Sequence, residues 1–571
     1  MSAQERLRIA GGSVYDPANG VDGDVRDVCI EDGRIVAELE AGAPTLDARG
    51  MIVMPGGVDI HAHLASASVN QGRRLLPEER QPAPAPDLVS GNGPPRSGTM
   101  GALPSTFTTG YRYAGLGYTT VFDAAVAPLL AREAHAELDD TPIVDGGCFV
   151  LMGNDEYLLR QIDAGENDRA RDYTAWLLGA AGGYAIKIVN PGGIERWKSG
   201  TRQALVGLDD VIGRKVTPRA IVETLADAAD GLALPHPVHV HCNGLGVPGN
   251  AGVTLETMRA LSGRRAHFAH LKFHSYGGKP GGRWSSAAGT ISEYVNAHPE
   301  VSADVGQVMF GRATTVTADA PVEYLLHASS GRKWVNVDVE LETGCGIVPY
   351  EYKERAAMAS LQWVVGLELF LLAADPWRMV LSTDHPNGGS FLSYPELIRL
   401  LMDRAYRDDQ LKRVNTKLLA GSVLADGLNR EYTLSEIAIV TRAGPARLLG
   451  LRHKGHLGPG ADADVTVYTR DADVSKMFAS PRYVLKGGQL VVEEGQLRRA
   501  PRGRRLHVRP GYDSGVLRDV RLFFDDFSTV QFENYPIGEL ADAPLEIPSS
   551  QDVAVHAGAE LVAQRSGGGN A

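Results

Sequence analysis

The spacing of hydrophobic and polar residues changes twice along the chain. Residues 7–54 contain short apolar runs separated by Asp-Gly and Gly-Gly pairs, which predicts β-strands joined by tight turns. The same pattern returns after residue 455, in GHLGPGADADVTVY and YVLKGGQLVVEEGQL. Because the two ends share this pattern, we expect residues 1–55 and 440–545 to form one composite β-sandwich domain.

Between these ends, over residues 56–439, apolar strands alternate with helical stretches. The expected strands include YTTVFDAA, TPIVDGGCFVL, GYAIKIVN, PVHVHCNG, RRAHFAHLKF, KWVNVDVEL and RMVLSTDH. About eight such units close a parallel sheet into a barrel. The predicted fold is therefore α/β, a (β/α)8 TIM-like barrel, and barrel enzymes carry their functional groups at the ends of the strands.

Composition narrows the class of protein. The chain of 571 residues is 43% hydrophobic and 22% charged, as in a globular protein, and has no apolar run long enough to span a membrane. The first residues lack the apolar core of a secretory signal, so we expect a cytoplasmic protein. A formal charge of −12 argues against a nucleic-acid partner. The four cysteines lie far apart and are expected to be buried free thiols.

Two segments are expected to lack regular structure. The stretch QPAPAPDLVSGNGPPRSG is rich in Pro and Gly, which favours a long loop on the barrel. Residues 546–571 end in RSGGGNA and are expected to form a disordered tail.

The motif GGVDIHAHL places His61 and His63 two residues apart on an expected strand. Side chains at this spacing point to the same face, and neutral imidazoles are suitable ligands for zinc. By itself such a pair is more often two ordinary histidines, so the interpretation depends on what the other strand ends carry.

Three further strand ends carry possible metal ligands: His241, His270 and Asp384. His239 and His267 are nearby alternatives, and an aspartate at a strand end can simply cap the next helix. Because the carboxyl ends of barrel strands meet on one rim, the set predicts a metal site there.

Lys187 lies inside the apolar run of GGYAIKIVNPGG, where a lone ammonium is expensive to bury. The lysine can extend to a carboxylate at the rim. Alternatively, burial keeps the amine neutral, so that it captures CO2 as a carbamate whose two oxygens bridge two metal ions.

The order of these residues, an HxH pair, a strand lysine, two single histidines and a final aspartate, resembles the amidohydrolase superfamily, including dihydropyrimidinases and dihydroorotases. Longer strings resemble the A-type subunit of formylmethanofuran dehydrogenases and of related formyltransferase/hydrolase complexes. They include MPGGVDIHAHLASASVNQGRRLLPEE, PSTFTTGYRYAGLGYTTVFDAAVAPL, HLKFHSYGG, ADVGQVMFG and LSTDHPNGGSFLSYP, and the resemblance spans residues 7 to about 470.

The resemblance implies a binuclear zinc centre. In it, His61, His63, Asp384 and the carboxylated Lys187 (N6-carboxylysine) hold one ion, while the carbamate, His241 and His270 hold the other. Asp384 is then the general base. The implied reaction is hydrolysis of the formamide bond of formylmethanofuran, or of a methylofuran analogue, to formate and the free amine, with partner subunits of B, C and D type.

Further residues are candidates for contact with the methanofuran-type coenzyme. Asn190, Asn243, His274 and Tyr276 are expected to line the pocket, while Arg73, Arg74 and Arg112 are expected to steer an anionic tail. Turn, core and surface roles are open alternatives for all of them. The loop PVHVHCNGLGVPGN has Gly244 after Asn243, where the family usually has a second asparagine.

Three other functions compete with this hydrolase. In methanogens the A-type subunit condenses formate with methanofuran as part of a dehydrogenase; here the excess of Arg over Lys and the many Ala and Gly residues favour the bacterial, hydrolytic setting. A free-standing cyclic amidase such as a hydantoinase would share the metal ligands but not the longer strings. A non-catalytic scaffold would not need the intact ligand set.

Overall fold

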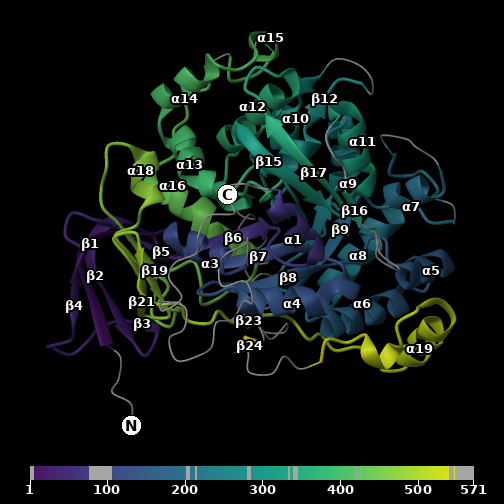
Figure 1. Cartoon of the computed structure of the whole chain (residues 1–571), viewed down its shortest axis with the longest axis horizontal. Coiled ribbons are helices and arrows are strands. Elements are labelled where there is room, and N and C mark those ends of the chain that lie inside the picture. Colours follow the sequence, from purple (N-terminus) through teal and green to yellow (C-terminus); the bar gives the residue numbers. More distant parts are fainter. Residues whose placement is uncertain are drawn as a thin grey trace, which may run out of the picture.

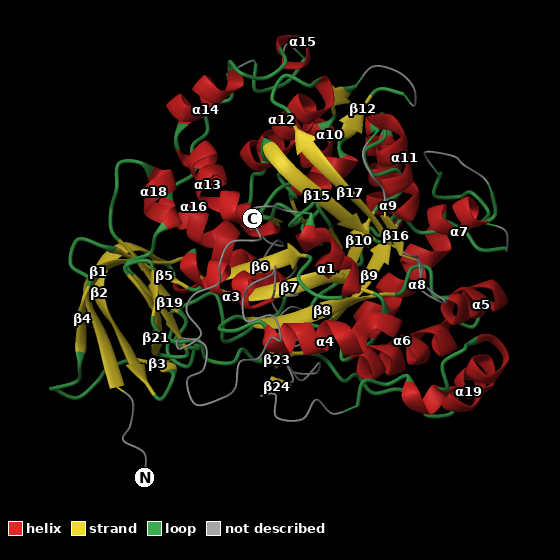
Figure 2. Cartoon of the chain, in the orientation of Figure 1, coloured by secondary structure: helices red, strands yellow, loops and turns green. Residues whose placement is uncertain are grey.

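Eight parallel strands form a barrel, which lies at the centre of the protein (Figures 1 and 2). The computed structural model describes residues 6–75, 106–200, 206–212, 215–279, 284–331, 335–337, 345–419, 421–425, 427–538 and 545–546. The barrel strands are β6 (Gly57–Ala62), β7 (Tyr118–Val126), β8 (Asp145–Leu151), β9 (Ala185–Val189), β10 (Val238–His241), β11 (Ala266–Phe268), β14 (Val301–Asp304) and β18 (Met379–Val380).

These strands pair with their neighbours in chain order, from β6 to β18. A parallel bridge between Ala62 and His385 joins the first strand to the last and closes the barrel. The barrel strands are buried almost throughout, as expected for a parallel sheet covered by helices. The (β/α)8 barrel predicted from the alternation of strands and helices is therefore confirmed.

Helices pack around the outside of the barrel (Figure 2). They include α3 (Thr106–Gly115), α4 (Ala131–Asp140), α5 (Glu156–Ala164), α6 (Asn167–Ala181), α8 (Pro218–Gly231), α9 (Asn250–Ala260), α10 (Ala288–Ala297), α12 (Ala357–Leu372) and α13 (Tyr394–Met402). Helix α12 is apolar on nearly every side, which is typical of a helix buried between neighbours. None of the helices in the described part of the chain is long and apolar enough to cross a membrane.

One of the strands predicted for the barrel does not belong to it. The described part of KWVNVDVEL, β16 (Val335–Val337), does not join the barrel but pairs antiparallel with β17 (Cys345–Tyr352), which also pairs with β15 (Gly311–Thr317). The barrel strand in this part of the chain is β14, with the sequence VSAD. Its alternate residues are polar because they face a polar barrel interior, so the search for apolar runs missed it.

Both ends of the chain contribute to one nine-stranded sheet beside the barrel (Figure 1). The two contributions meet where β5 (Ile52–Pro55) pairs antiparallel with β19 (Val465–Tyr468). The other strands are β1 (Arg6–Asp16), β2 (Val21–Glu31), β3 (Arg34–Val36), β4 (Thr45–Asp47), β20 (Tyr483–Lys486), β21 (Gln489–Glu493) and β22 (Gln496–Leu497). Farther along, α19 (Val516–Phe527) lies beside α6 on the barrel.

A buried ionic cluster joins the sheet to the barrel. The Nζ atom of Lys486 lies 2.6 Å from Asp145 of β8 and 2.8 Å from Asp464, and Lys454 contacts the same two carboxylates. Burial would raise the pKa of Asp145, but the two lysines hold it well below its usual value. The carboxylates are thus paired with lysines, which assigns the cluster a structural role.

The remaining predictions concern the cysteines and the two segments expected to lack regular structure. Cys29, Cys148 and Cys242 are buried free thiols, as expected. The Pro- and Gly-rich stretch lies outside the described residues, and so does the tail from residue 547.

Candidate metal centre

The metal ligands predicted from the sequence lie at the carboxyl ends of the barrel strands. His61 is the last residue but one of β6 and His63 follows that strand, Lys187 lies in β9, and His241 is the last residue of β10. His270 and Asp384 follow β11 and β18. All six side chains are buried.

Three non-glycine residues shortly after barrel strands have a positive φ: Asn190 (42°), His270 (33°) and Asp384 (51°). This conformation is costly for residues with a side chain, and such strain is typically found where the surrounding structure holds a functional group in place. The backbone of the turns after β9, β11 and β18 is therefore strained, and this conformation sets the direction of these three side chains.

One group of ligands forms around Asp384. The Nε2 atoms of His61 and His63 each lie 3.1 Å from Oδ1 of Asp384. The other ring nitrogen of His61, Nδ1, lies 2.9 Å from Oδ1 of Asp304, at the end of β14. A carboxylate on one nitrogen orients an imidazole so that the other nitrogen faces a metal. Asp304 therefore holds His61 with Nε2 facing Asp384, the orientation that a metal ligand would need.

The charges of this group depend on one another. Burial would lower the pKa of His61, but Asp304 and Asp384 raise it to about 9. Burial would raise the pKa of Asp384, but His270 and His61 hold it well below its usual value. Asn387 also donates a hydrogen bond of 3.0 Å from Nδ2 to Oδ1 of Asp384. Asp384 is therefore an ionised carboxylate among groups that favour its charge.

Lys187 is 1% exposed, and its Nζ atom has no hydrogen-bond partner among the described residues. Burial lowers the pKa of Lys187 to about 8, although Asp304 and Asp384 oppose this effect. In the sheet, Lys187 is in register with His239, one inward-facing position below His241. A long, unpaired amine with a depressed pKa fits the chemistry of carbamate formation better than a structural ion pair does.

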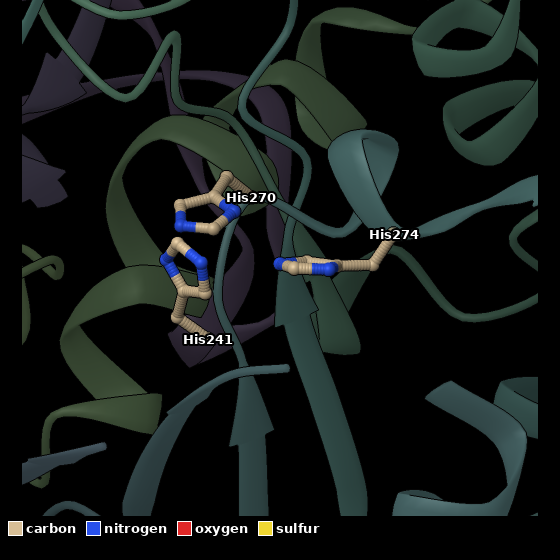
Figure 3. Close-up of side chains that lie close together, drawn as sticks. All are labelled: His241, His270 and His274. Carbon is tan, nitrogen blue, oxygen red and sulfur yellow. The ribbon is translucent and has the colours of Figure 1, made fainter. Parts of the chain in front are cut away.

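A second group of ligands contains His241, His270 and His274 (Figure 3). The ring centroids of His241 and His270 are 4.7 Å apart. Nε2 of His241 lies 3.2 Å from Oδ2 of Asp319, whose other oxygen accepts a hydrogen bond from Asn190. Burial lowers the pKa of all three histidines, so the rings are neutral, as metal ligands must be.

The alternative histidines, His239 and His267, lie deeper in the barrel. His239 lies 3.0 Å from His236 and 3.1 Å from His61, each between ring nitrogens. His267 contacts Ser302 at 2.9 Å and Asp304 at 3.3 Å. Because both nitrogens of each ring are occupied, these histidines support the ligands above them, which favours His241 and His270 as the ligands.

Two of the expected substrate contacts, Asn243 and Tyr276, have structural partners. Asn243 donates from Nδ2 to the carbonyl oxygens of Pro191 and Val206, and so braces two loops. Tyr276 is fully buried, with its ring 5.5 Å from that of Trp284. The role of these residues in substrate binding stays a prediction.

Two of the three arginines expected to steer an anionic tail affect the pKa of His385, the residue next to Asp384. Burial lowers the pKa of His385 to about 3, and the charges of Arg73 and Arg112 contribute to this. Arg73 ends α1 (Ala67–Arg74) together with Arg74. The positive charges of Arg73 and Arg112 therefore act on His385.

Sequence reasoning missed Asp304, Asp319 and Asn387. Asp304 would have been found by recognising VSAD as a barrel strand, because its last residue then falls on the functional rim. Asp319 caps α11 (Ala320–Ser330), and its side chain accepts from the Val322 N–H. In the sequence it reads only as a helix cap, so no local signal marks it.

The absence of a side chain at Gly306 leaves room for His270. Its φ is +63°, and a Cβ atom added there would lie 2.3 Å from Cβ of His270. We expect Gly306→Ala to displace His270, to reduce metal content, and to cost at least about 1–3 kcal/mol of stability. Metal analysis and thermal unfolding measure both effects. Gly289→Ala, in helix α10 where nothing lies within 4 Å of the added atom, is the control. Equal metal content in both variants would contradict this role of Gly306.

The residues present fit metal ions. Among the described residues, buried ring nitrogens of His270 and His274 and the amine of Lys187 have no hydrogen-bond partner. Such groups are rare in folded proteins unless a ligand satisfies them. The two groups of ligands lie side by side, since the rings of His61 and His270 are 5.1 Å apart.

Comparisons with known proteins show the family to which the chain belongs. The chain matches the model of the Amidohydrolase family over residues 45–492. It is 43% identical over 555 residues to Protein FwdA of Methanocaldococcus jannaschii, covering 93% of this chain and 96% of that protein. It is 39% identical over 564 residues to the A-type subunit of the formyltransferase/hydrolase complex Fhc of Methylorubrum extorquens, covering 96% of this chain and 100% of that one.

A solved structure is similar over nearly the whole chain. It is the crystal structure of the formyltransferase/hydrolase complex FhcABCD from Methylorubrum extorquens in complex with methylofuran. One of its chains matches with a TM-score of 0.88 and 38% identity, covering 95% of this chain and 100% of that chain. The chain therefore belongs to the amidohydrolase family and, within it, to the group that contains FwdA and the A-type subunit of Fhc.

Proposed function

We propose that this protein is the A-type subunit of a formyltransferase/hydrolase complex and hydrolyses the formamide bond of a formylated methanofuran-type coenzyme, such as formylmethylofuran. The observation that carries the proposal is the match over 95% of the chain to a component of a complex with methylofuran. The two groups of metal ligands at the barrel rim support it.

Two zinc ions would be held by the two groups. His61, His63 and Asp384 would hold one ion, His241 and His270 the other, and Lys187, carboxylated to N6-carboxylysine, would bridge them. When bound, such ions lower the pKa of a water molecule and polarise a carbonyl oxygen.

Asp384 would carry the proton. It would take the proton of the attacking water at a carboxylate oxygen and deliver it to the nitrogen of the leaving amine, so that one group serves both steps. Asn387 keeps the carboxylate in place through its hydrogen bond to Oδ1. Asp304 holds His61 in the orientation that leaves Nε2 facing Asp384.

The substrate is proposed to bind with its formyl group at the metal centre and its anionic tail directed outward. The charges of Arg73 and Arg112 near His385 suit such a tail. Asn190, Asn243 and Tyr276 remain proposed contacts for the furan part. The proposed partners are subunits of B, C and D type, and the cytoplasmic location stays a prediction.

The proposal is tested by purifying the protein with its native partners and measuring formate released from a formylated furan-methylamine. We expect release that stops when a chelator removes the metal and returns when zinc is added. A truncated substrate without the anionic tail should bind more weakly. Absence of formate release from the metal-loaded complex with the full coenzyme would refute the proposal.

The same experiment separates the alternatives. Co-purifying subunits with iron–sulfur and tungsten or molybdenum centres would indicate the dehydrogenase setting, in which formate is condensed with the amine. Turnover of cyclic amides such as hydantoins by the isolated chain would indicate a free-standing amidase. Metal-free protein within an intact complex would indicate a scaffold.

A further inference from the structure

His274 differs from the other histidines inside the barrel. It ends the short helix η4 (Leu271–His274), one turn after His270, and is 1% exposed. Neither of its ring nitrogens has a hydrogen-bond partner among the described residues. By contrast, His239 and His267 each have partners for both ring nitrogens. Histidines that support the fold here are thus satisfied, and His274 is not.

The ring of His274 faces two proposed metal ligands (Figure 3). Its centroid lies 5.0 Å from that of His241 and 5.2 Å from that of His270. One ring nitrogen from each of the three histidines lies within 4.8 Å of the others. Zinc–nitrogen bonds of about 2.0–2.1 Å allow one ion to bind three such nitrogens after small movements of the rings.

The way the chain folds explains why the three rings converge. His241 ends β10, whereas His270, with its positive φ, is the N-cap of η4 and lies two residues after β11. The short helix η4 then turns the chain once, and His274 at its end lies beside His270. The rings of His270 and His274 are accordingly stacked, with an interplanar angle of 28°.

We propose that His274 is a third histidine ligand of the ion held by His241 and His270. This inference rests on the metal centre of the proposed function and gives His274 a different role from the substrate contact expected from the sequence. The second ion then has three ligands of its own beside the lysine bridge, as many as His61, His63 and Asp384 give the first ion.

The test is titration of metal-free protein, in the native complex, with Co2+ in bicarbonate buffer. We expect the wild type to bind two equivalents. In His274→Gln, the first equivalent should bind as in the wild type, while the second weakens at least ~100-fold, since even outer partners of ligands contribute ~10–100-fold. The visible cobalt spectrum of the second equivalent should also change. His298→Gln is the matched control, because His298 stacks on Tyr294 at the amino end of β14.

A second variant gives a direct signal of ligation. His274→Cys should retain the second ion and show a sulfur-to-cobalt charge-transfer band, which appears only if this side chain binds the metal. A folded His274→Cys without that band, or His274→Gln with wild-type affinity and spectrum for both equivalents, would overturn the proposal. A wild type that binds both ions but releases no formate would refute the proposed hydrolase and leave the ligand role of His274 intact.

Discussion

Replacing Asp384 by Asn is expected to lower kcat for formamide hydrolysis by about 10²–10⁴-fold, the usual contribution of a general acid–base group. Asn has nearly the same volume, and the barrel around residue 384 should fold as before. The amide, however, cannot accept and return a proton at neutral pH. Since the change removes proton transfer rather than the pocket, KM should change much less than kcat.

Loss of metal must be separated from loss of the proton carrier, because Asp384 has both roles. The charge of Asp384 helps to raise the pKa of His61 to about 9, so its removal also changes the metal site. Zinc content is therefore measured beside kcat, and activity is compared at equal metal occupancy. Asp375→Asn is the matched control, since Asp375 precedes β18 at the opposite end of the barrel. Near-normal turnover of metal-loaded Asp384→Asn would show that another group carries the proton.

The pattern of the sequence predicts the barrel well because most of its strands obey a simple rule. In a parallel sheet covered by helices, both faces are buried, so strands such as AIKIV in β9 read as apolar runs. The rule fails for β14, because Ser302 and Asp304 contact His267 and His61 inside the barrel. It also misassigned KWVNVDVEL, whose alternation is typical of an antiparallel strand.

The residues of the candidate site also fall into those that could be predicted from the sequence and those that could not. Residues at strand ends, such as His241 and Asp384, could be predicted because the barrel places every strand end on one rim. Asp319 could not, since it comes from the segment between β15 and α11, and only the packing of that segment brings its carboxylate to 3.2 Å from His241. Long-range contacts of this kind leave no local pattern in the sequence.

Replacing Lys187 by Ala is expected to lower metal content and activity together, with activity falling at least as far as in Asp384→Asn. Without the carbamate, two cations would face each other with less negative charge between them. The proposed histidine ligands of each ion remain, so binding should weaken rather than vanish. Metal titration and formate release, measured on the same preparation, give the two effects.

The depressed pKa of Lys187 makes the bridge sensitive to pH and CO2. Only the neutral amine reacts with CO2, and a pKa of about 8 leaves about a tenth of the amine neutral at pH 7, against a few in ten thousand for an ordinary lysine. Activation of metal-free protein by zinc should therefore be faster with bicarbonate than in CO2-free buffer. It should also become faster as pH rises toward 8.

The same pKa shift predicts how the metal-free, CO2-free protein responds to pH. The folded-state pKa of about 8 lies below the ordinary value of 10.5, so the unfolded chain binds this proton more tightly. The resulting loss of stability is complete below about pH 8 and is relieved as pH rises to about 10.5. Relative to Lys187→Ala, the wild type should gain stability over this window.

A small carboxylic acid provides the decisive comparison for the bridge. In Lys187→Ala, added acetate could enter the vacated space and supply two oxygens, so partial recovery of metal binding and activity is expected. Recovery should be incomplete, because an untethered ligand loses translational freedom that the lysine stem does not. Should Lys187→Ala keep both metals and full activity without added acid, Lys187 would be a buried structural cation and the carbamate bridge would be wrong.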